Sequence, residues 1–356
     1  METELEIKIE KSRQSRISEV DFSCLGFGNY VTDHMFVSEY KNGLWDNTQI
    51  LPFGKISIAP NALAFHYGQT VFEGMKAFRM MNGNISIFRI DKHFKRINTS
   101  LKRMCMPEIP FELFSESLIH LVRIDNEWVK NIQGTSMYLR PFVIATEERF
   151  GVKVSDEYKY FVFAGAVDNY YSKPLKVKIE ESYIRAAKGG TGFAKCGGNY
   201  GGSFYPTYLA KLQGYDQVLW TDGSQEHNVE ESGTMNIMFI IDNKLVTPAI
   251  SDTILGGVTR DSILKLAKDL NYKTEERNIS KFELQEKFKQ GKITEAFGTG
   301  TAADTAPIET IHISGTDYHL PDYTDSCFHR KAKKLLMDIR LGIEQDKYNW
   351  NTVLGV

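Results

Sequence analysis

Apolar side chains recur along the chain with two periods, and the two periods alternate from one end of the sequence to the other. Stretches in which β-branched and aromatic residues dominate or alternate with polar ones predict strands at residues 35–40, 55–59, 136–146, 158–167, 175–182, 217–222, 234–242 and 293–297. Apolar positions three and four residues apart predict helices from residue 91, from residue 280 and over 111–129, 203–213, 259–271 and 324–344. Because strands and helices mix throughout, the pattern predicts an α/β or α+β fold.

A polar segment with turn residues interrupts the strands at residues 168–174 and ends at Pro174. A chain of 356 residues is also long for one small core. We therefore expect a small N-terminal domain over residues 1–168, a linker over 169–174 and a larger domain over 175–356.

Composition limits the classes of binding partner that we expect for this protein. A net charge of −2 and a pI near 6.5 give no electrostatic reason to expect nucleic acid or an anionic membrane surface. No apolar run approaches the roughly 20 residues that cross a bilayer, and the N-terminus alternates acids and bases. The four cysteines, Cys24, Cys105, Cys196 and Cys327, include no CxxC pair. We expect a cytoplasmic protein with reduced thiols, no metal and a small-molecule ligand.

The segment from Ile184 to Gly202 is the most unusual part of the chain. It holds seven glycines between Gly189 and Gly202, together with Lys188 and Lys195. Neither lysine precedes Ser or Thr, as a P-loop requires, and no GxGxxG lies at a strand-to-helix junction. Either lysine can then serve as a phosphate-binding cation or as an amine that forms a Schiff base.

Three further segments offer groups that a ligand bound to a lysine amine could use. Glu231 lies before a glycine turn, where a buried carboxylate can hold the proton of a ring nitrogen. Val258 and Thr259 begin a helix, so their amides offer an anion site, and the small-residue turn at 297–302 offers another. Each turn alone is more simply structural. Together, an amine, an acid and amides for a phosphate match pyridoxal 5′-phosphate.

Seven segments, in the same order, resemble the branched-chain amino acid aminotransferases. They are Thr32–Met35, His66–Gly74, Tyr138–Pro141, Lys195–Tyr200, Glu231–Asn236, Leu255–Arg260 and Gly298–Ala302. The resemblance covers residues 20 to 350. It implies fold type IV of the pyridoxal-phosphate enzymes, in which a small N-terminal α/β domain and a larger domain with a barrel-like sheet hold the cofactor between them in a homodimer.

The resemblance also assigns roles that composition leaves open. It implies that Lys195, not Lys188, bonds to the cofactor, with Glu231 at the pyridine nitrogen and Tyr200 at the phenolic oxygen. It implies a phosphate site from Arg96, the amides of Val258 and Thr259, and the Thr301 hydroxyl. The amides of Thr301 and Ala302 are expected to bind the substrate α-carboxylate. Without the resemblance, Arg96 is more simply a solvated residue of a charged helix face.

For the reaction, the resemblance implies leucine, isoleucine and valine as amino donors and 2-oxoglutarate as acceptor, with Lys195 moving the proton from Cα and ping-pong kinetics. The substrate pocket is expected from Phe27, Tyr67, Phe72, Tyr138, Arg140 and Val152, with Val152 reaching a neighbouring subunit. Two alternatives share the fold, D-amino acid transaminase and aminodeoxychorismate lyase. A third is a non-catalytic phospholigand-binding protein.

The sequence departs from the family at two places. Some animal members carry a CxxC redox pair after the small-residue turn, where this chain has Ala303–Ala306. Gly256 stands where a proline is common in the phosphate turn. Thiol regulation at the first position is therefore not expected.

Overall fold

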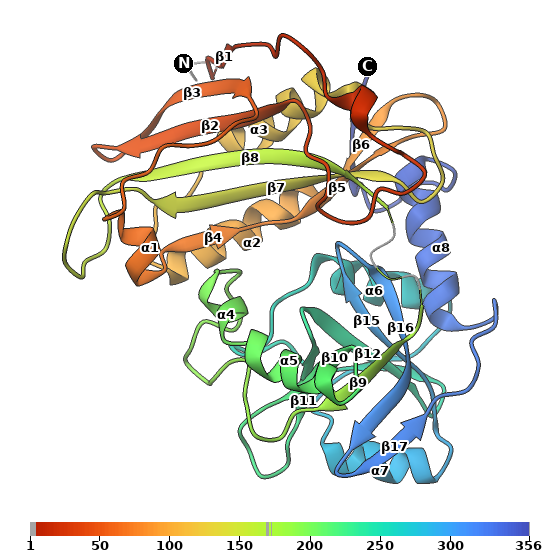
Figure 1. The fold of residues 1–356 in the computed structure, drawn as a ribbon. Coiled ribbons are helices and arrows are strands. Elements are labelled where there is room, and N and C mark those ends of the chain that lie inside the picture. The colour runs from red at the N-terminus through yellow and green to blue at the C-terminus, as the bar shows by residue number, and fades with distance from the viewer. Residues whose placement is uncertain (1–4, 169–170, 172, 356) are drawn as a thin grey trace. The chain divides into compact units, whose positions relative to one another are not determined.

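The computed structural model describes residues 5–168, 171 and 173–355, and its chain packs into two compact units. The first unit consists of the described residues of Met1–Tyr170, Ala194–Gly198 and Ile339–Val356, and the second of Tyr171–Phe193 and Asn199–Asp338. Figure 1 shows the ribbon coloured along the chain. In the described part of the chain, no helix has both the length and the apolar character needed to cross a membrane.

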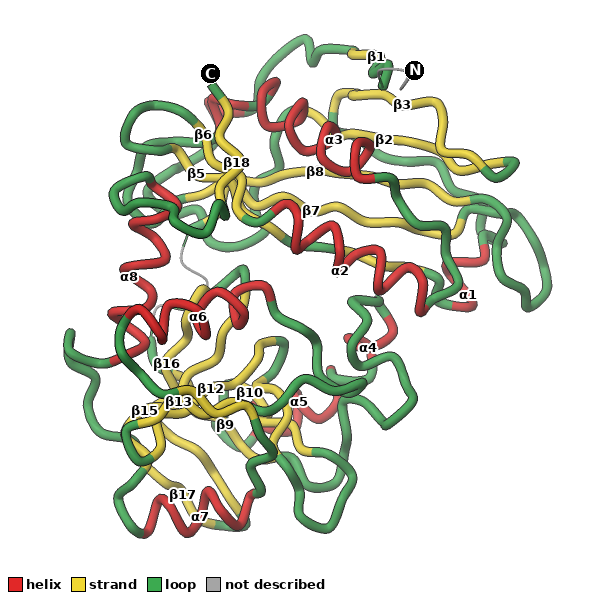
Figure 2. The backbone as a smooth tube through the Cα atoms, turned by 180° about the vertical axis from the view of Figure 1, so that it is seen from behind, coloured by secondary structure: helices red, strands yellow, loops and turns green. Residues whose placement is uncertain are grey.

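The first unit is built on a mixed sheet with the strand order β1-β3-β2-β8-β7-β5-β6-β18, and β4 pairs with β7. Its strands are β1 (Lys8–Ile9), β2 (His34–Lys41), β3 (Leu44–Pro52), β4 (Thr70–Phe72), β5 (Met75–Arg79), β6 (Ile85–Phe88), β7 (Ser136–Ala145), β8 (Tyr158–Val167) and β18 (Asn351–Leu354). Its helices are η1 (Ile17–Glu19), α1 (Leu63–Tyr67), α2 (Ile90–Arg103), α3 (Phe111–Ile124) and η2 (Asn126–Trp128). Helices α2 and α3 lie on the same face of this sheet, as both views show (Figures 1 and 2).

Helix α2 positions several site residues, and its sequence explains why it forms. Ile97 and Leu101 are fully buried in the core, four residues apart on one side of the helix. Asp91 lies in the first turn and two basic residues in the last, which suits the helix dipole. His93 and Ser100 are also buried, so this helix directs polar groups inward beside its apolar stripe.

The second unit contains a closed sheet. Its strands are β9 (Leu175–Ile179), β10 (Gln217–Thr221), β11 (Val229–Ser232), β12 (Met235–Ile241), β13 (Lys244–Thr247), β14 (Thr274–Glu276), β15 (Ile293–Gly300), β16 (Asp304–Ile313) and β17 (Thr316–His319). Strands β11, β10, β9, β16, β15 and β12 pair in that order, and the β11–β12 pairing closes the ring. The expected barrel-like sheet is therefore confirmed. Alternate residues of β12, Ile237, Phe239 and Ile241, are buried in its core.

Helices surround this barrel. They are α4 (Gly198–Gly201), α5 (Phe204–Leu212), α6 (Val258–Asp269), α7 (Lys281–Lys289) and α8 (Phe328–Leu341), the last of which continues into the first unit. Helix α7 begins as its sequence predicts, because the Ser280 side chain accepts a hydrogen bond of 3.1 Å from the Glu283 amide. The Glu283 carboxylate forms an ion pair with Arg277, so only half of the expected capping box forms.

Two predictions about local structure were wrong. Residues 55–59 form no strand, and the strand that pairs with β2 is β3, which the periodicity missed. The turn between β2 and β3 is made by Asn42 and Gly43, both with positive φ, at 54° and 84°. Asn-Gly is the sequence most typical of a two-residue hairpin turn.

The compact units differ from the predicted domains at two segments. Residues 194–198 and 339–355 were expected in the second domain, yet they pack with the first unit. Strand β18 adds to the sheet beside β6 with Leu354 opposite Ile85, and the Ser86 hydroxyl donates to the Arg340 carbonyl at 2.7 Å. Residues 169, 170 and 172 of the expected linker lie outside the described residues.

Candidate active site

Lys195 is held by its backbone from both sides in the first unit. Its N–H donates to the Ser100 hydroxyl of α2 at 2.9 Å, and its carbonyl accepts from the Phe72 N–H at 3.0 Å. The next residue, Cys196, forms an antiparallel bridge with Val71. The Lys195 amine lies 4.8 Å from the centroid of the Phe72 ring. A short segment of the glycine-rich stretch thus extends a sheet edge, and this fixes the backbone position from which the Lys195 side chain projects.

The glycines of that stretch act locally in different ways. Gly189 has a φ of +75°, which favours glycine. A Cβ on Gly192 would lie 2.6 Å from the backbone of Thr253, so that position requires close approach of two chain segments. Lys188 precedes both glycines and lies on an exposed turn. Lys195 follows them and has backbone hydrogen bonds on both sides.

Arg96 belongs to a buried cluster on α2 and the β4–β5 connection. Its Nε and Nη2 atoms donate to the two carboxylate oxygens of Glu73 at 2.6 and 2.7 Å, and His93 Nδ1 lies 2.8 Å from Oε2. Burial favours the neutral acid, but the Arg96 guanidinium and His93 hold the pKa of Glu73 well below its usual range. The Arg96 side chain is only 11% exposed, so a solvated surface role is wrong.

Burial also lowers the pKa of His93, together with the charges of Arg96 and Lys195 and against the attraction of Glu73. Burial and the nearby cations therefore disfavour a further positive charge on His93, whose Nδ1 faces the Glu73 carboxylate.

Four residues predicted for the substrate pocket, Phe27, Phe72, Tyr138 and Arg140, form one cluster. The Arg140 guanidinium lies 4.9 Å from the centroid of Phe72 and 5.3 Å from that of Tyr138, and Nη2 donates to the Tyr138 hydroxyl at 3.3 Å. Phe27 meets Tyr138 edge to face at 4.9 Å. Since the Lys195 amine also contacts Phe72, the structure brings apolar walls and a cation to the predicted reactive group.

Two predicted pocket residues lie elsewhere. Tyr67 is 41% exposed and its ring neighbours that of His66 at 6.1 Å. Val152 is 82% exposed, in a loop with Phe150. Neither is tied to the Phe72 cluster by a contact described in the structure, and their substrate roles stay predictions.

Gly74 should tolerate no side chain, because a Cβ there would lie 1.7 Å from the Tyr138 hydroxyl. We expect Gly74→Ala to displace the Tyr138 ring and raise KM for leucine, the donor that the resemblance implies, about tenfold with a smaller change in kcat. Steady-state kinetics would measure this. Gly43→Ala is the control, at a turn glycine outside the cluster that has a positive φ but no atom within 4 Å of an added Cβ. Unchanged KM in Gly74→Ala would contradict the placement of Tyr138 at the substrate.

In the second unit, one face of the barrel sheet carries a row of polar side chains. Glu231 of β11 is paired with Asn236 of β12, Asn236 with Thr299 of β15, and Thr299 with Thr305 of β16. Residues paired across antiparallel strands point to the same face. The Thr299 and Thr305 hydroxyls are buried and have no hydrogen-bond partner among the described residues. This row is the opposite face from the apolar core that contains Ile237.

Glu231 is held by both carboxylate oxygens. Oε1 accepts from the Leu255 N–H at 2.7 Å, and Oε2 lies 3.3 Å from Nε of Arg185. Arg185 also donates to the carbonyls of Gly192, at 3.0 Å, and Thr253. An arginine therefore connects the acid, the glycine-rich stretch and the loop before α6.

The neighbouring acid, Glu230, predicts a pH dependence of stability. Burial raises the pKa of Glu230 to about 7, with Asp222 and Glu231 adding to it against Thr253 and Arg185. Because the folded pKa exceeds the unfolded value, this group's contribution to stability falls as pH rises from about 4.5 to 7. Glu230→Gln should therefore stabilise the protein by roughly 2–3 kcal/mol at pH 8 and by much less near pH 5.

Denaturant unfolding at both pH values measures this difference, with exposed Glu226→Gln as the control. An effect of Glu230→Gln that is equal at pH 5 and pH 8 would contradict a raised pKa.

The first residues of α6, where an anion site is predicted, have no side-chain cap. The extended Gly257 precedes the helix, so the amides of Val258 and Thr259 are first-turn donors at a positive helix end. Asn236 fastens the turn, since its Nδ2 donates to the Leu255 carbonyl at 2.8 Å. A Cβ on Gly257 would lie 1.9 Å from Asn236 Oδ1, which explains the glycine.

The second small-residue turn is shorter than predicted. Strand β15 continues through Gly300, and the turn covers Thr301 to Ala303. Glycines at 298 and 300 instead lie beside the Met235 side chain. Thr301 and Ala302, both predicted to contact ligand, therefore lie in the turn itself.

Tyr200 lies on the short helix α4. Its carbonyl accepts from the amide and the hydroxyl of Ser203, at 3.0 and 2.7 Å. Asn199, beside it, donates to the Thr191 carbonyl at 2.8 Å, which ties α4 to the glycine-rich stretch. The contact of Tyr200 with the cofactor stays a prediction.

Known proteins match this chain over most of its length. Residues 70–311 match the family Amino-transferase class IV. The chain is 42% identical over 335 residues to branched-chain-amino-acid transaminase 1 of Bacillus subtilis (strain 168), covering 93% of this chain and 94% of that protein. It is 40% identical to the branched-chain-amino-acid aminotransferase of Mycolicibacterium smegmatis, covering 91% of each. The chain belongs to the branched-chain amino acid aminotransferases.

Solved structures extend the match to the fold. The aminotransferase of Thermoproteus uzoniensis, solved with norvaline, has a TM-score of 0.73 at 24% identity and covers 90% of this chain and 99% of its own. The aminotransferase of Thermobaculum terrenum, solved in its PLP-form, has a TM-score of 0.73 at 22% identity and covers 90% of this chain and 98% of its own. The prediction of fold type IV is confirmed.

Sequence reasoning about this aminotransferase missed Glu73, His93, Ser100, Arg185 and Asn236. Glu73 lies within an apolar segment, where a buried acid requires a cation, and that was the available signal. His93 and Ser100 lie three residues before and four after Arg96, which places them on its side of α2. Arg185 and Asn236 carry no comparable signal, because their partners, backbone carbonyls and the Glu231 carboxylate, lie in other parts of the sequence.

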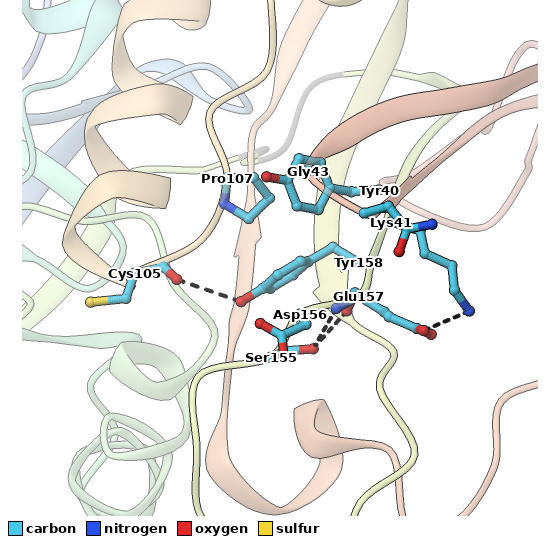
Figure 3. Close-up of a pocket in the computed structure, with 10 residues that line it drawn as sticks. Tyr40, Lys41, Gly43, Cys105, Pro107, Ser155, Asp156, Glu157 and Tyr158 are labelled. Carbon is cyan, nitrogen blue, oxygen red and sulfur yellow. Dashed lines mark hydrogen bonds and ion pairs between the residues drawn. The ribbon is translucent and has the colours of Figure 1, made fainter.

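Another hollow of the first unit, about 530 Å³, lies between the β2–β3 turn, the end of α2 and the start of β8. Figure 3 shows Tyr40, Lys41, Cys105 and Tyr158 around it. Lys41 pairs with Glu157 at 2.6 Å. No predicted site residue lines this hollow, so it is separate from the Lys195 cluster.

Proposed function

We propose that this aminotransferase transfers the amino group of leucine, isoleucine or valine to 2-oxoglutarate with pyridoxal 5′-phosphate as cofactor. The names of its close relatives support the substrate class. The observation that carries the proposal is the Lys195 amine beside the Phe72 ring, with Arg140 over the same ring. An amine, an apolar wall and a cation meet where a branched side chain and a dicarboxylate must both be accepted.

The groups present fit the cofactor. When bound, its aldehyde takes up the substrate's amino group and its ring accepts the electrons left at Cα. Lys195 would bond to the aldehyde and, once released by substrate, move the proton from Cα, because its backbone is fixed at both ends. Glu231 would keep the ring nitrogen protonated by its negative charge.

The phosphate would be held by charge and by amides. Arg96 supplies the cation, the uncapped α6 N-terminus supplies the Val258 and Thr259 amides, and Thr301 a hydroxyl. The amides of Thr301 and Ala302 would receive the substrate α-carboxylate, and Tyr200 the cofactor's phenolic oxygen.

Substrate choice would follow from the Phe72 cluster. Phe27, Phe72 and Tyr138 offer the apolar surface that one branched chain requires. Arg140 offers a charged, hydrogen-bonding edge to the second carboxylate of 2-oxoglutarate. Tyr67 and Val152 would complete the pocket, Val152 from a neighbouring subunit.

A side-by-side assay tests this function. The purified protein with pyridoxal 5′-phosphate is given leucine, D-alanine or aminodeoxychorismate, with 2-oxoglutarate for the two amino acids. We expect 2-oxoisocaproate from leucine and little product from the other two. Pyruvate from D-alanine, or breakdown of aminodeoxychorismate, at a higher rate would favour the other activities of this fold. A protein that binds the cofactor without turnover would favour a phospholigand-binding role.

We further propose a homodimer in the cytoplasm. Helix α5 exposes Phe204, Tyr205, Tyr208 and Leu212 at 58–69%, an apolar surface of a kind that marks an interface. None of the four cysteines, all described, is in a disulfide, which suits a reducing compartment. Sedimentation equilibrium would give twice the mass of 40.6 kDa for the dimer.

A further inference from the structure

Glu73 is a buried carboxylate to which the reaction as described gives no role. It is fully buried, directly after Phe72, and four donors surround its two oxygens. These are Arg96 through Nε and Nη2, His93 through Nδ1, and the Gly74 N–H at 3.1 Å. Such a carboxylate costs much to bury and is maintained only by this degree of pairing.

The two-point contact with Arg96 fixes an orientation as well as a charge. A guanidinium bound through Nε and one terminal nitrogen has its plane set by the carboxylate. His93, one turn earlier on α2, contacts Glu73 Oε2, the oxygen that also accepts from Arg96 Nη2. The direction in which Arg96 can present itself to an anion is therefore determined by Glu73.

The Glu73–Arg96 pair is also connected to Lys195, through Phe72 and Ser100. The Phe72 N–H donates to the Lys195 carbonyl at 3.0 Å. On the other side, the Ser100 hydroxyl accepts from Lys195 N–H at 2.9 Å and donates to the Arg96 carbonyl at 2.9 Å. Lys195, Phe72, Glu73, Arg96 and Ser100 thus form a closed ring of covalent and hydrogen bonds.

We propose that Glu73 is a positioning residue that aligns Arg96 for the cofactor phosphate and, through this ring, sets that arginine at a fixed place relative to Lys195. The inference rests on the proposed phosphate role of Arg96. Its consequence is that Glu73 contributes to the binding of a phosphorylated aldehyde and not to that of the same aldehyde without phosphate.

The test compares two ligands, pyridoxal 5′-phosphate and pyridoxal, on the cofactor-free protein. Dissociation constants come from the quenching of intrinsic fluorescence, so no turnover is needed. The variants are Glu73→Gln, Arg96→Gln, the double variant, and Asp91→Asn as a control at an exposed position of the same helix. We expect Glu73→Gln to weaken pyridoxal 5′-phosphate by about 10- to 100-fold and pyridoxal by less than about twofold.

The double variant separates the proposed role of Glu73 from the proposed role of Arg96. If Glu73 acts through Arg96, Glu73→Gln has no further effect on the preference for phosphate once Arg96→Gln is present. If Arg96→Gln leaves that preference unchanged, the proposed phosphate role of Arg96 is wrong. If Arg96→Gln removes it but Glu73→Gln weakens both ligands equally, or strengthens the phosphorylated one, the role of Glu73 proposed here is wrong.

A second variant, Glu73→Asp, keeps the proposal testable if Glu73→Gln folds poorly. Glu73→Asp keeps the negative charge and shortens the side chain by one methylene, so it cannot reach both Arg96 nitrogens and His93 in the present geometry. We expect it to lose at least about tenfold of the preference for phosphate, again with pyridoxal binding retained. Full retention of that preference in Glu73→Asp would show that charge alone matters and would overturn the positioning role.

Discussion

Replacement of Lys195 by alanine should lower the rate of leucine transamination by at least about four orders of magnitude. The variant loses both the amine that bonds to the cofactor and the base that moves the Cα proton. Its backbone contacts with Ser100 and Phe72 do not depend on the side chain, so the fold should persist. Formation of 2-oxoisocaproate under saturating leucine measures the effect.

Two variants serve as controls for this loss. Lys195→Arg retains a positive charge near Phe72 but forms no such bond, so it should be nearly as inactive as the alanine variant. Lys188→Ala, on the exposed turn of the glycine-rich stretch, should retain at least about half of the activity because surface substitutions have small effects. Substantial turnover by Lys195→Ala would overturn the assignment of the reactive amine.

Replacement of Glu231 by glutamine should lower kcat by about 10²- to 10³-fold, the range for loss of one preorganised charge. A glutamine oxygen can still accept from the Leu255 N–H, which Glu231 binds at 2.7 Å. What disappears is the negative charge that holds a proton on the ring nitrogen, beside a remaining Arg185 at 3.3 Å. Single-turnover kinetics with leucine isolates this step.

The matched control for Glu231 is Glu230→Gln, which changes an adjacent acid of the same strand. Glu230 is bound by the Thr253 hydroxyl and not by Leu255, so we expect kcat within about threefold of the parent, because it touches no predicted ligand atom. Similar losses in both variants, or almost no loss in Glu231→Gln, would contradict the role of Glu231 at the ring.

Sequence periodicity predicted most helices and long strands because these elements bury one regular face. Strands β7 and β8 were predicted within one residue, since ten consecutive positions alternate or remain apolar. Strand β3 was missed because Asp46, Asn47 and Gln49 interrupt its apolar pattern. The Asn42-Gly43 pair would have located it.

Strand β11 and the closure of the barrel were beyond periodicity. β11 has only four residues, and two of them are the glutamates Glu230 and Glu231, which are typical of loops. All four are nevertheless buried, because the strand is paired on both sides, with β10 and with β12. Such pairings depend on contacts across the fold and not on local sequence.

The candidate site divides in the same way. Lys195, Glu231 and the α6 N-terminus were predicted from chemistry and resemblance, since each has a sequence signal of its own. The ring that joins Phe72 and Glu73 to Arg96, Ser100 and Lys195 was not, because Glu73 and Arg96 are 23 residues apart and Ser100 and Lys195 are 95 apart. Only the packing of α2 on the sheet brings them together.

The most direct test of the account is to find the lysine that bonds to the cofactor. The protein is saturated with pyridoxal 5′-phosphate, reduced with borohydride, digested, and sequenced by mass spectrometry. We predict a phosphopyridoxyl group on Lys195, in a peptide that continues through Cys196. The same group on Lys188, or on any other lysine, would contradict the central claim.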